Sequence, residues 1–105
     1  MNDRELLELA AKAAEYEYKK HSGCVVVEGI PKNWNPLTDD GDALRLAVKL
    51  GLILDCEYQS AMPHDRQGVG EDWLDGDGKD DPYAATRRAI VRAAAEIAKQ
   101  QEQPR

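Results

Sequence analysis

The sequence predicts one α+β domain, in which three helices pack on a small antiparallel sheet of two or three strands in the order α-β-α-β-(β)-α. Three observations predict this class: three segments carry apolar residues at helical spacing, short β-branched runs lie between them, and the connections are short. A chain of 105 residues can bury a core without disulfides or metals. We expect the domain to span residues 1–99 and residues 100–105 to form a disordered tail.

The first helix is predicted to run from Arg4 to Tyr18. Its apolar residues recur at helical spacing and define one buried face, formed by Leu6, Leu7, Ala10, Ala11, Ala14 and Tyr18. Asp3 is the expected N-cap, because its carboxylate can accept a hydrogen bond from a free backbone N–H at the helix start. The pair Ser22-Gly23 then ends the helical segment.

The valine-rich run from Cys24 to Glu28 predicts a strand that is buried on both faces. Residues 29–36 hold a glycine and two prolines, which indicate a loop. Cys24 and Cys56 are the two cysteines, and they do not form a pair with metal-binding spacing. We expect both to be reduced, buried thiols in apolar surroundings.

The second helix is predicted to start after Thr38, with Thr38 or Asp39 as its N-cap and Gly51 at its C-terminal stop. Its apolar surface is unusually wide and comprises Ala43, Leu44, Leu46, Ala47, Val48 and Leu50. Acidic residues crowd its first turn, where the helix dipole favours negative charge; they are Asp39, Asp40 and Asp42. We therefore interpret these carboxylates as helix-stabilising and not catalytic.

A second strand is predicted from Leu52 to Tyr58. Residues 59–70 show no clear pattern, and a third strand is expected over Val69–Leu74. Asp75–Gly78 then predicts a turn.

The third helix has the clearest start signal, with Asp81 as N-cap and Pro82 in the first helical position. Its predicted inward face comprises Tyr83, Thr86, Ile90, Ala93, Ala94 and Ile97. Its predicted outward face is mostly basic and comprises Arg87, Arg88, Arg92, Glu96 and Lys99. We expect this helix to end near Lys99.

The overall charge restricts the partners. The 20 acidic residues exceed the 14 basic ones, and the resulting net charge of -6 disfavours nucleic acid and anionic membranes as partners. No apolar run approaches the length of about 20 residues that a transmembrane helix needs. The first residues lack the basic and apolar regions of a signal peptide, so we expect a cytoplasmic protein.

Three segments carry a family resemblance: Asp3–Ala10, Trp34–Ala43 and Asp81–Ala93. Together they resemble small phage and prophage proteins with the phage α-β-α (ABA) sandwich domain. The resemblance implies an α-β-α arrangement with an Asn-Pro turn before a capped helix. The family has no assigned activity, so no catalytic or binding residue is carried over. This chain departs from the family pattern between Glu57 and Asp80, where the loop is long and acidic.

No catalytic or metal-binding pattern emerges. Asp75–Gly78 is similar to the start of a calcium-binding EF-hand loop, but Lys79 and Thr86 occupy positions where ligands should stand. His21 and His64 do not form a triad spacing with a nucleophile, and apolar burial would raise the pKa of the Cys24 thiol. No glycine-rich phosphate loop is present. We expect no enzyme activity, no cofactor and no metal.

Four residues are candidates for contact with a partner: Trp34, Trp73, Arg88 and Arg92. Tryptophan is common at interface hot spots, although each tryptophan can instead pack inside the domain. The arginines belong to a basic stripe, which can also be a solvated face or pair with acidic residues of the same chain. The wide apolar surface of the second helix also suggests a homodimer.

The function expected from kinship and from the lack of reaction chemistry is that of a phage or prophage accessory protein. Such a protein would act by binding a host or phage protein. One alternative is an acidic nucleic-acid mimic that inhibits a host DNA-binding protein. A further alternative is a small-ligand binder or an enzyme of an unrecognised class.

Overall fold

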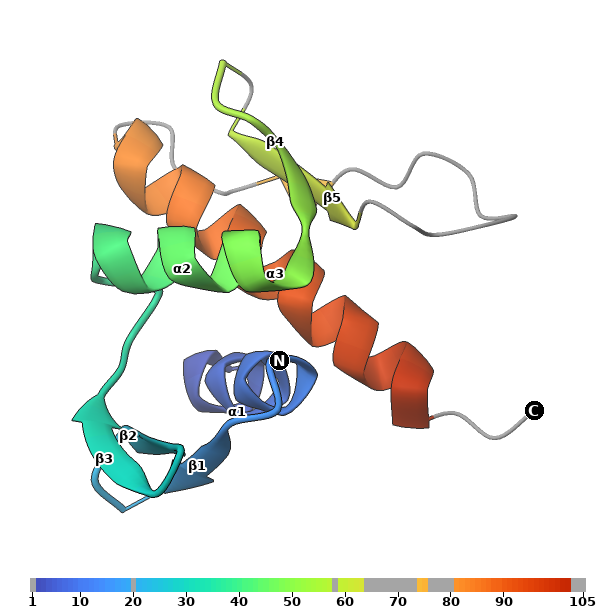
Figure 1. The fold of residues 1–105 in the computed structure, drawn as a ribbon. Helices are drawn as coiled ribbons and strands as arrows, with labels where there is room; N and C mark the ends of the chain where they lie inside the picture. Colours follow the sequence, from blue (N-terminus) through green and yellow to red (C-terminus); the bar gives the residue numbers. More distant parts are fainter. Residues whose placement is uncertain (1, 20, 58, 64–73, 76–80, 103–105) are drawn as a thin grey trace.

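The computed structural model describes residues 2–19, 21–57, 59–63, 74–75 and 81–102 (Figure 1). It confirms the α+β class, with three helices and antiparallel strands. The strands form two separate sheets, however, and not the single sheet that was predicted. The elements are α1 (Asp3–Ala13), β1 (Glu17–Lys19), β2 (Cys24–Val27), β3 (Ile30–Asn33), α2 (Asp40–Leu50), β4 (Leu52–Asp55), β5 (Ser60–Pro63), β6 (Leu74–Asp75) and α3 (Pro82–Glu102).

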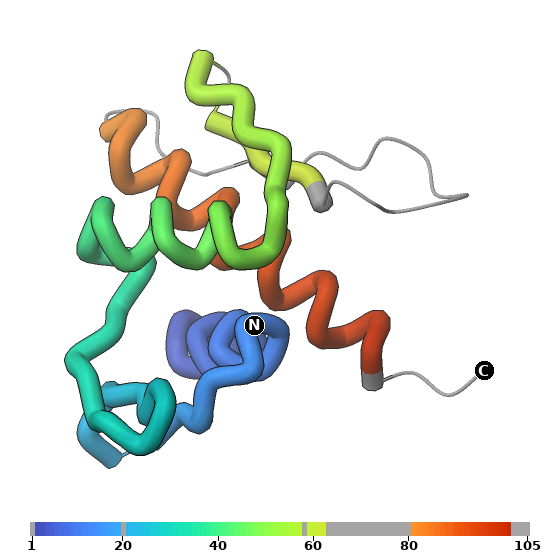
Figure 2. The backbone as a smooth tube through the Cα atoms, viewed as in Figure 1, coloured from blue at the N-terminus to red at the C-terminus, as the bar shows by residue number. Residues whose placement is uncertain are grey.

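The two sheets lie at opposite ends of the molecule (Figure 1). The first sheet has the order β1-β2-β3 and adjoins α1, while the second has the order β4-β5-β6 and follows α2. Helix α3 runs past both α1 and α2 and contacts the second sheet (Figure 2). One continuous hydrophobic core therefore joins the two ends.

Helix α1 is shorter than predicted. Its N-cap is Asn2, whose side chain accepts a hydrogen bond from the Glu5 N–H at 2.8 Å, so the predicted cap Asp3 is instead the first helical residue. The helix ends at Ala13, and Glu15 takes a positive φ of 64°. The prediction of a helix up to Tyr18 is wrong because this turn redirects the chain into β1.

The first sheet lies partly in the segment that was predicted to be a loop. Glu28 and Gly29 both have positive φ values, 53° and 79°, as a two-residue hairpin turn requires. They connect β2 to β3, which lies at the edge of this sheet, and proline is tolerated in an edge strand such as this one, at Pro31. In β2 only Val25 is fully buried, so burial on both faces is also wrong.

Helix α2 begins and ends where the sequence predicts. The Asp39 side chain accepts a hydrogen bond from the Asp42 N–H at 2.8 Å, which makes Asp39 the N-cap. Gly51 has a φ of 65° and occupies the left-handed position at the C-terminal end.

The strand predicted over Leu52–Tyr58 is shorter in the structure. Strand β4 ends at Asp55, whose Oδ1 accepts a hydrogen bond from the Glu57 N–H at 3.1 Å as the chain turns. The chain returns as β5, antiparallel to β4. Of the strand predicted over Val69–Leu74, only Leu74 is described, and it begins β6; the predicted turn after Asp75 lies outside the described residues.

Helix α3 starts as predicted and ends later. The Asp81 Oδ1 atom accepts hydrogen bonds from the N–H groups of Tyr83 and Ala84, at 3.0 and 3.1 Å. The helix continues to Glu102, so residues 100–102 are helical where a disordered tail was predicted. Tyr83 is 70% exposed and does not belong to the inward face.

Alanine dominates the described core. Helices α1 and α3 pack against each other through small side chains, including Ala10, Ala11, Ala89, Ala93 and Ala94. The largest fully buried side chains include Leu46, Val25 and Val91. Small side chains allow the two helix backbones to approach closely, but each contributes little buried area.

Candidate functional site

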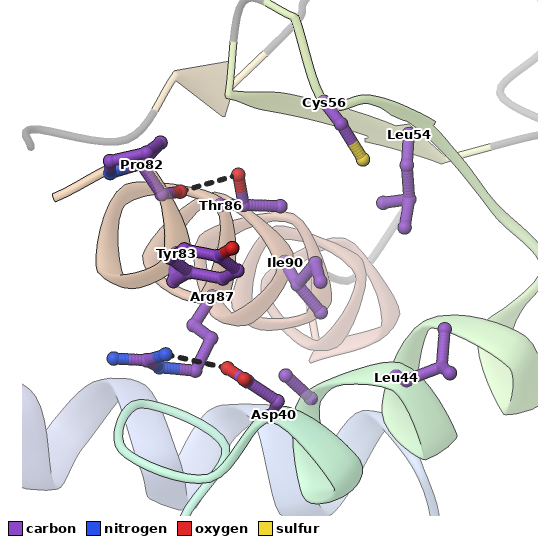
Figure 3. Close-up of a pocket in the computed structure, with 10 residues that line it drawn as sticks. Asp40, Leu44, Leu54, Cys56, Pro82, Tyr83, Thr86, Arg87 and Ile90 are labelled. Carbon is purple, nitrogen blue, oxygen red and sulfur yellow. Dashed lines mark hydrogen bonds and ion pairs between the residues drawn. The ribbon is translucent and has the colours of Figure 1, made fainter.

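An apolar groove lies between the first turns of α3, helix α2 and strand β4. Its volume is about 440 Å³. Figure 3 shows the side chains that line it, which are Asp40, Ala43, Leu44, Leu54, Cys56, Pro82, Tyr83, Thr86, Arg87 and Ile90. The consecutive elements α2 and β4 therefore form one concave surface with α3, which is distant from them in sequence.

Helix α2 supplies the wall that carries Leu44. The cap at Asp39 fixes the start of the helix, and Leu44 then lies more than one turn further along. Its side chain is 58% exposed although it is large and apolar. Val48, one turn beyond Leu44, is 72% exposed, so the wide apolar surface predicted for this helix is only partly buried.

Helix α3 supplies the opposite wall. The Asp81 cap and Pro82 set its first turn, which places the exposed ring of Tyr83 beside the groove (Figure 3). The hydroxyl of Thr86 donates a hydrogen bond to the Pro82 carbonyl at 2.8 Å. That bond occupies the Thr86 hydroxyl hydrogen and leaves the methyl group as the apolar part of the side chain. Ile90 is 3% exposed and belongs to the core.

Strand β4 supplies the third side through Leu54 and the residue that follows the strand, Cys56. Leu54 is partly buried and packs against the core, whereas Cys56 is exposed.

The other cysteine, Cys24 in β2, is half-buried, and its Sγ lies 3.3 Å from the Asn33 Oδ1 atom. The prediction of two buried thiols is therefore wrong.

The two charged residues that line the groove pair with each other. The Arg87 Nη1 donates to the Asp40 Oδ1 at 2.6 Å, and the Arg87 Nε donates to the Leu37 carbonyl at 2.8 Å. The Arg87 side chain is 17% exposed and the Asp40 side chain 69%. Arg87 thus fastens α3 to the start of α2, and the ion pair leaves the groove without a net charge of its own.

The acidic residues at the start of α2 serve the fold. Asp39 caps the helix, and Asp42 accepts hydrogen bonds from the Asn35 N–H at 2.9 Å and from Arg45 Nη2 at 2.7 Å. The hydrogen bond that Arg45 donates to Asp42 raises the pKa of Arg45, with help from the negative charges of Asp42 and Asp39. This arrangement confirms the capping role predicted for Asp39.

Of the candidate partner residues, Trp34, Arg88 and Arg92 are described, and none of these three lines the groove. Trp34 is 7% exposed, and the rings of Tyr16 and Tyr18 meet it edge-on at centroid distances of 6.0 and 6.2 Å. It therefore packs inside the domain, which was the alternative interpretation. Trp73 lies outside the described residues.

The basic stripe of α3 is largely used within the chain. The Arg88 Nη2 donates to the Asp3 Oδ1 at 3.0 Å, which ties α3 to α1. Arg92 is half-buried and also has an interaction partner. Arg87, predicted to face outward, is the residue of this stripe that reaches the groove.

A second hollow, of about 530 Å³, lies over α1 and β1. It is lined by Glu5, Glu8, Leu9, Lys12, Tyr16 and Tyr18. Charges of both signs line it, and the Lys49 ammonium lies 5.4 Å from the Tyr16 ring centroid. This surface is more polar than the groove and offers fewer apolar anchors.

Two further searches cover only the residues that the structure describes. In these ranges no group of three or more His, Cys, Asp or Glu side chains is arranged to hold a metal ion. In the same part of the chain, no helix combines the length and the hydropathy that a membrane crossing requires. His64 and most of the acidic segment from Glu71 to Asp81 lie outside these ranges.

Comparison of the chain with protein-family models, with curated proteins and with solved structures finds no match. The resemblance to phage and prophage proteins therefore stays a prediction from the sequence.

Proposed function

We propose that this chain is a phage or prophage accessory protein that acts by binding a host or phage protein through the apolar groove. The observation that carries this proposal is the groove itself, with Leu44 and Tyr83 exposed on its walls. Large exposed apolar side chains beside a concave surface are typical of interaction sites.

The chemistry of the lining supports binding over reaction. Asp40 and Arg87 neutralise each other, and Arg87 is also held by the Leu37 carbonyl. Most other lining groups are apolar. An apolar side chain of a partner would bury Leu44 and Tyr83, and burial of such anchors supplies most of the binding energy at protein interfaces.

The test is affinity purification of the tagged protein from its bacterial host during phage growth, followed by mass spectrometry. Leu44→Asp places a charge on the groove wall, and Ile30→Asp is the matched control. Ile30 is 62% exposed, close to the 58% of Leu44, but lies in β3 of the other sheet. We expect Leu44→Asp to lose a partner that the unchanged chain and Ile30→Asp both retain. Equal recovery with both variants would exclude the groove as the contact surface.

A small apolar ligand is the second candidate, and the volume of the groove favours it. Ligand pockets span about 300–1,000 Å³ and are mostly apolar with a few polar groups, as in this groove. A thermal-shift screen with apolar fragments tests this candidate, because a ligand that binds the native state raises the melting temperature. A shift that Leu44→Asp abolishes would favour a ligand over a protein partner.

The acidic nucleic-acid mimic gains no support from the described residues. The acidic side chains at the start of α2 are engaged in capping and ion pairs, through Asp39, Asp40 and Asp42. Association with a DNA-binding host protein that weakens steeply with salt would favour this alternative.

A further inference from the structure

Strand β4 is an edge strand of the second sheet and lies beside the groove. In the second sheet β5 is the central strand, and β4 pairs with it in a register from Leu52 opposite Pro63 to Asp55 opposite Ser60. Within the described ranges no strand pairs with the other edge of β4. Such an edge presents backbone N–H and C=O groups that another extended chain can pair with.

The groove lies beside β4, on the side of the strand where Leu54 packs against the core. The face of β4 that carries Leu52 and Leu54 packs against the core, and Leu54 also lines the groove. Beyond β4 lie the first turns of α3 and the wall formed by α2 (Figure 3). A strand added to β4 would therefore continue the sheet over these helices, and its inward side chains would enter the groove.

We infer that the groove takes an extended segment of a partner protein, which pairs through its backbone with β4 and inserts an apolar side chain between Leu44, Leu54 and Tyr83. This inference rests on the proposed function and specifies the form of the partner. The backbone hydrogen bonds would supply affinity, and the groove would select the side chain, as in other cases of β-strand addition.

The charges around the groove specify the flanks of that segment. Asp81 lies at the start of α3, which borders the groove, and Glu57 follows the lining residue Cys56; both are exposed. The cation in the lining, Arg87, is already paired with Asp40. The rim is therefore acidic, and it favours a segment with lysine or arginine on either side of the apolar residue.

The same charges disfavour a second copy of this chain as the occupant. Pairing β4 with β4 of a second copy would bring two acidic rims together, and each chain carries a net charge of -6. Like charges brought together across an interface oppose association. A basic extended segment can instead pair its backbone with the edge of β4, and its charge is opposite to that of the acidic rim.

The experiment uses displayed peptide libraries of about nine residues, the length that an extended segment needs to cover a short strand and its flanks. The apolar residues in the centre stand either at alternate positions or at helical spacing, and the flanks are either Lys/Arg or Asp/Glu. The full chain is the bait. The best peptide is then synthesised with N-methyl groups on alternate amides, because one set of amides would face β4 and the other would face solvent.

We expect enrichment of peptides with basic flanks and alternating apolar residues. Methylation of one alternate set of amides should weaken binding about tenfold, while methylation of the other set leaves it unchanged. Leu44→Asp should weaken binding about tenfold or more, and Ile30→Asp should not change it. Together these outcomes support strand addition in the groove.

Several outcomes overturn the inference. Enrichment of a helical pattern or of acidic flanks does so, as does equal binding by both N-methylated sets, or no enrichment at all. Concentration-dependent dimerisation that Leu44→Asp abolishes would assign the groove to a second copy. If no strand peptide is selected but a captured protein is lost only with Leu44→Asp, the proposed function stands and the strand inference fails. If Leu44→Asp affects neither assay, both fail.

Discussion

Replacing Arg87 with methionine measures how firmly α3 is fastened to the start of α2. The guanidinium donates to the Leu37 carbonyl at 2.8 Å and to the Asp40 carboxylate at 2.6 Å. The two bonds differ in their surroundings, because the carbonyl contact is partly buried and the Asp40 side chain is 69% exposed. Methionine keeps most of the apolar stem and removes both bonds.

The two contributions can be separated by magnitude. A hydrogen bond from a charged group is worth about 1.5–3 kcal/mol, whereas an exposed ion pair is worth about 0–1 kcal/mol. We therefore expect Arg87→Met to lower the free energy of unfolding by about 2–3 kcal/mol. Asp40→Ala should lower it by about 1 kcal/mol, since it loses the ion pair and a favourable charge at a helix N-terminus.

Urea denaturation of the two single variants and the double variant, at low and high salt, gives these values. The loss in Arg87→Met should persist at high salt, because salt screens the exposed ion pair more than the partly buried carbonyl contact. Arg88→Met is the control, since it removes an ion pair with Asp3, which is 62% exposed. Equal losses in Asp40→Ala and Arg87→Met would refute the reasoning, because the ion pair would then carry the whole effect.

Three further substitutions test the fold by the same urea assay. Leu46→Ala should cost about 2–5 kcal/mol, because Leu46 is 1% exposed and its removal leaves a cavity; a cost below 1 kcal/mol would contradict its place in the core. Gly51→Ala should cost about 1–2 kcal/mol through its φ of 65° alone, since nothing lies within 4 Å of the added Cβ, and Gly51→Asn should cost less. Asp39→Ala should cost about 1 kcal/mol through the lost N-cap, whereas Asp39→Asn should retain most of the stability.

The sequence predicted those parts of the fold whose signals are local. Asp39, Gly51 and Asp81 act within one helical turn, and all three lie at the helix ends where they were expected. The end of α1 was not predictable in this way. Glu15 takes a left-handed φ without being glycine or asparagine, and Tyr18 continues the helical spacing although it lies in β1.

Strand β3 was missed because Pro31 and Gly29 were interpreted only as loop signals. Glu28-Gly29 is instead a two-residue hairpin turn, and proline is compatible with a strand at the edge of a sheet. The division into two sheets depends on which strands pair, and this is settled by packing on the helices. No local pattern in the sequence predicts which strands pair.

The groove was not predicted either, because three separate elements form its walls and no local sequence pattern shows how these elements pack. One signal in the sequence did point to it, namely the wide apolar surface of the second helix. Leu44 and Val48 exceed what a single buried face can hold, and both are exposed in the structure. Trp34, a candidate for partner contact, does not lie in the groove; it packs against two tyrosines inside the domain.

The alanine-rich contact between α1 and α3 bears on how stability varies with temperature. The heat capacity of unfolding rises with the apolar surface that becomes exposed, and it is about 12–15 cal/mol/K per residue in ordinary domains. The chain has no phenylalanine, and most of the described core side chains are alanine, so unfolding exposes little apolar surface per residue. We therefore expect a heat capacity change at or below the lower end of that range. The stability curve of this protein would then be shallow, and cooling would weaken the fold less than it weakens a domain with a phenylalanine- and leucine-rich core.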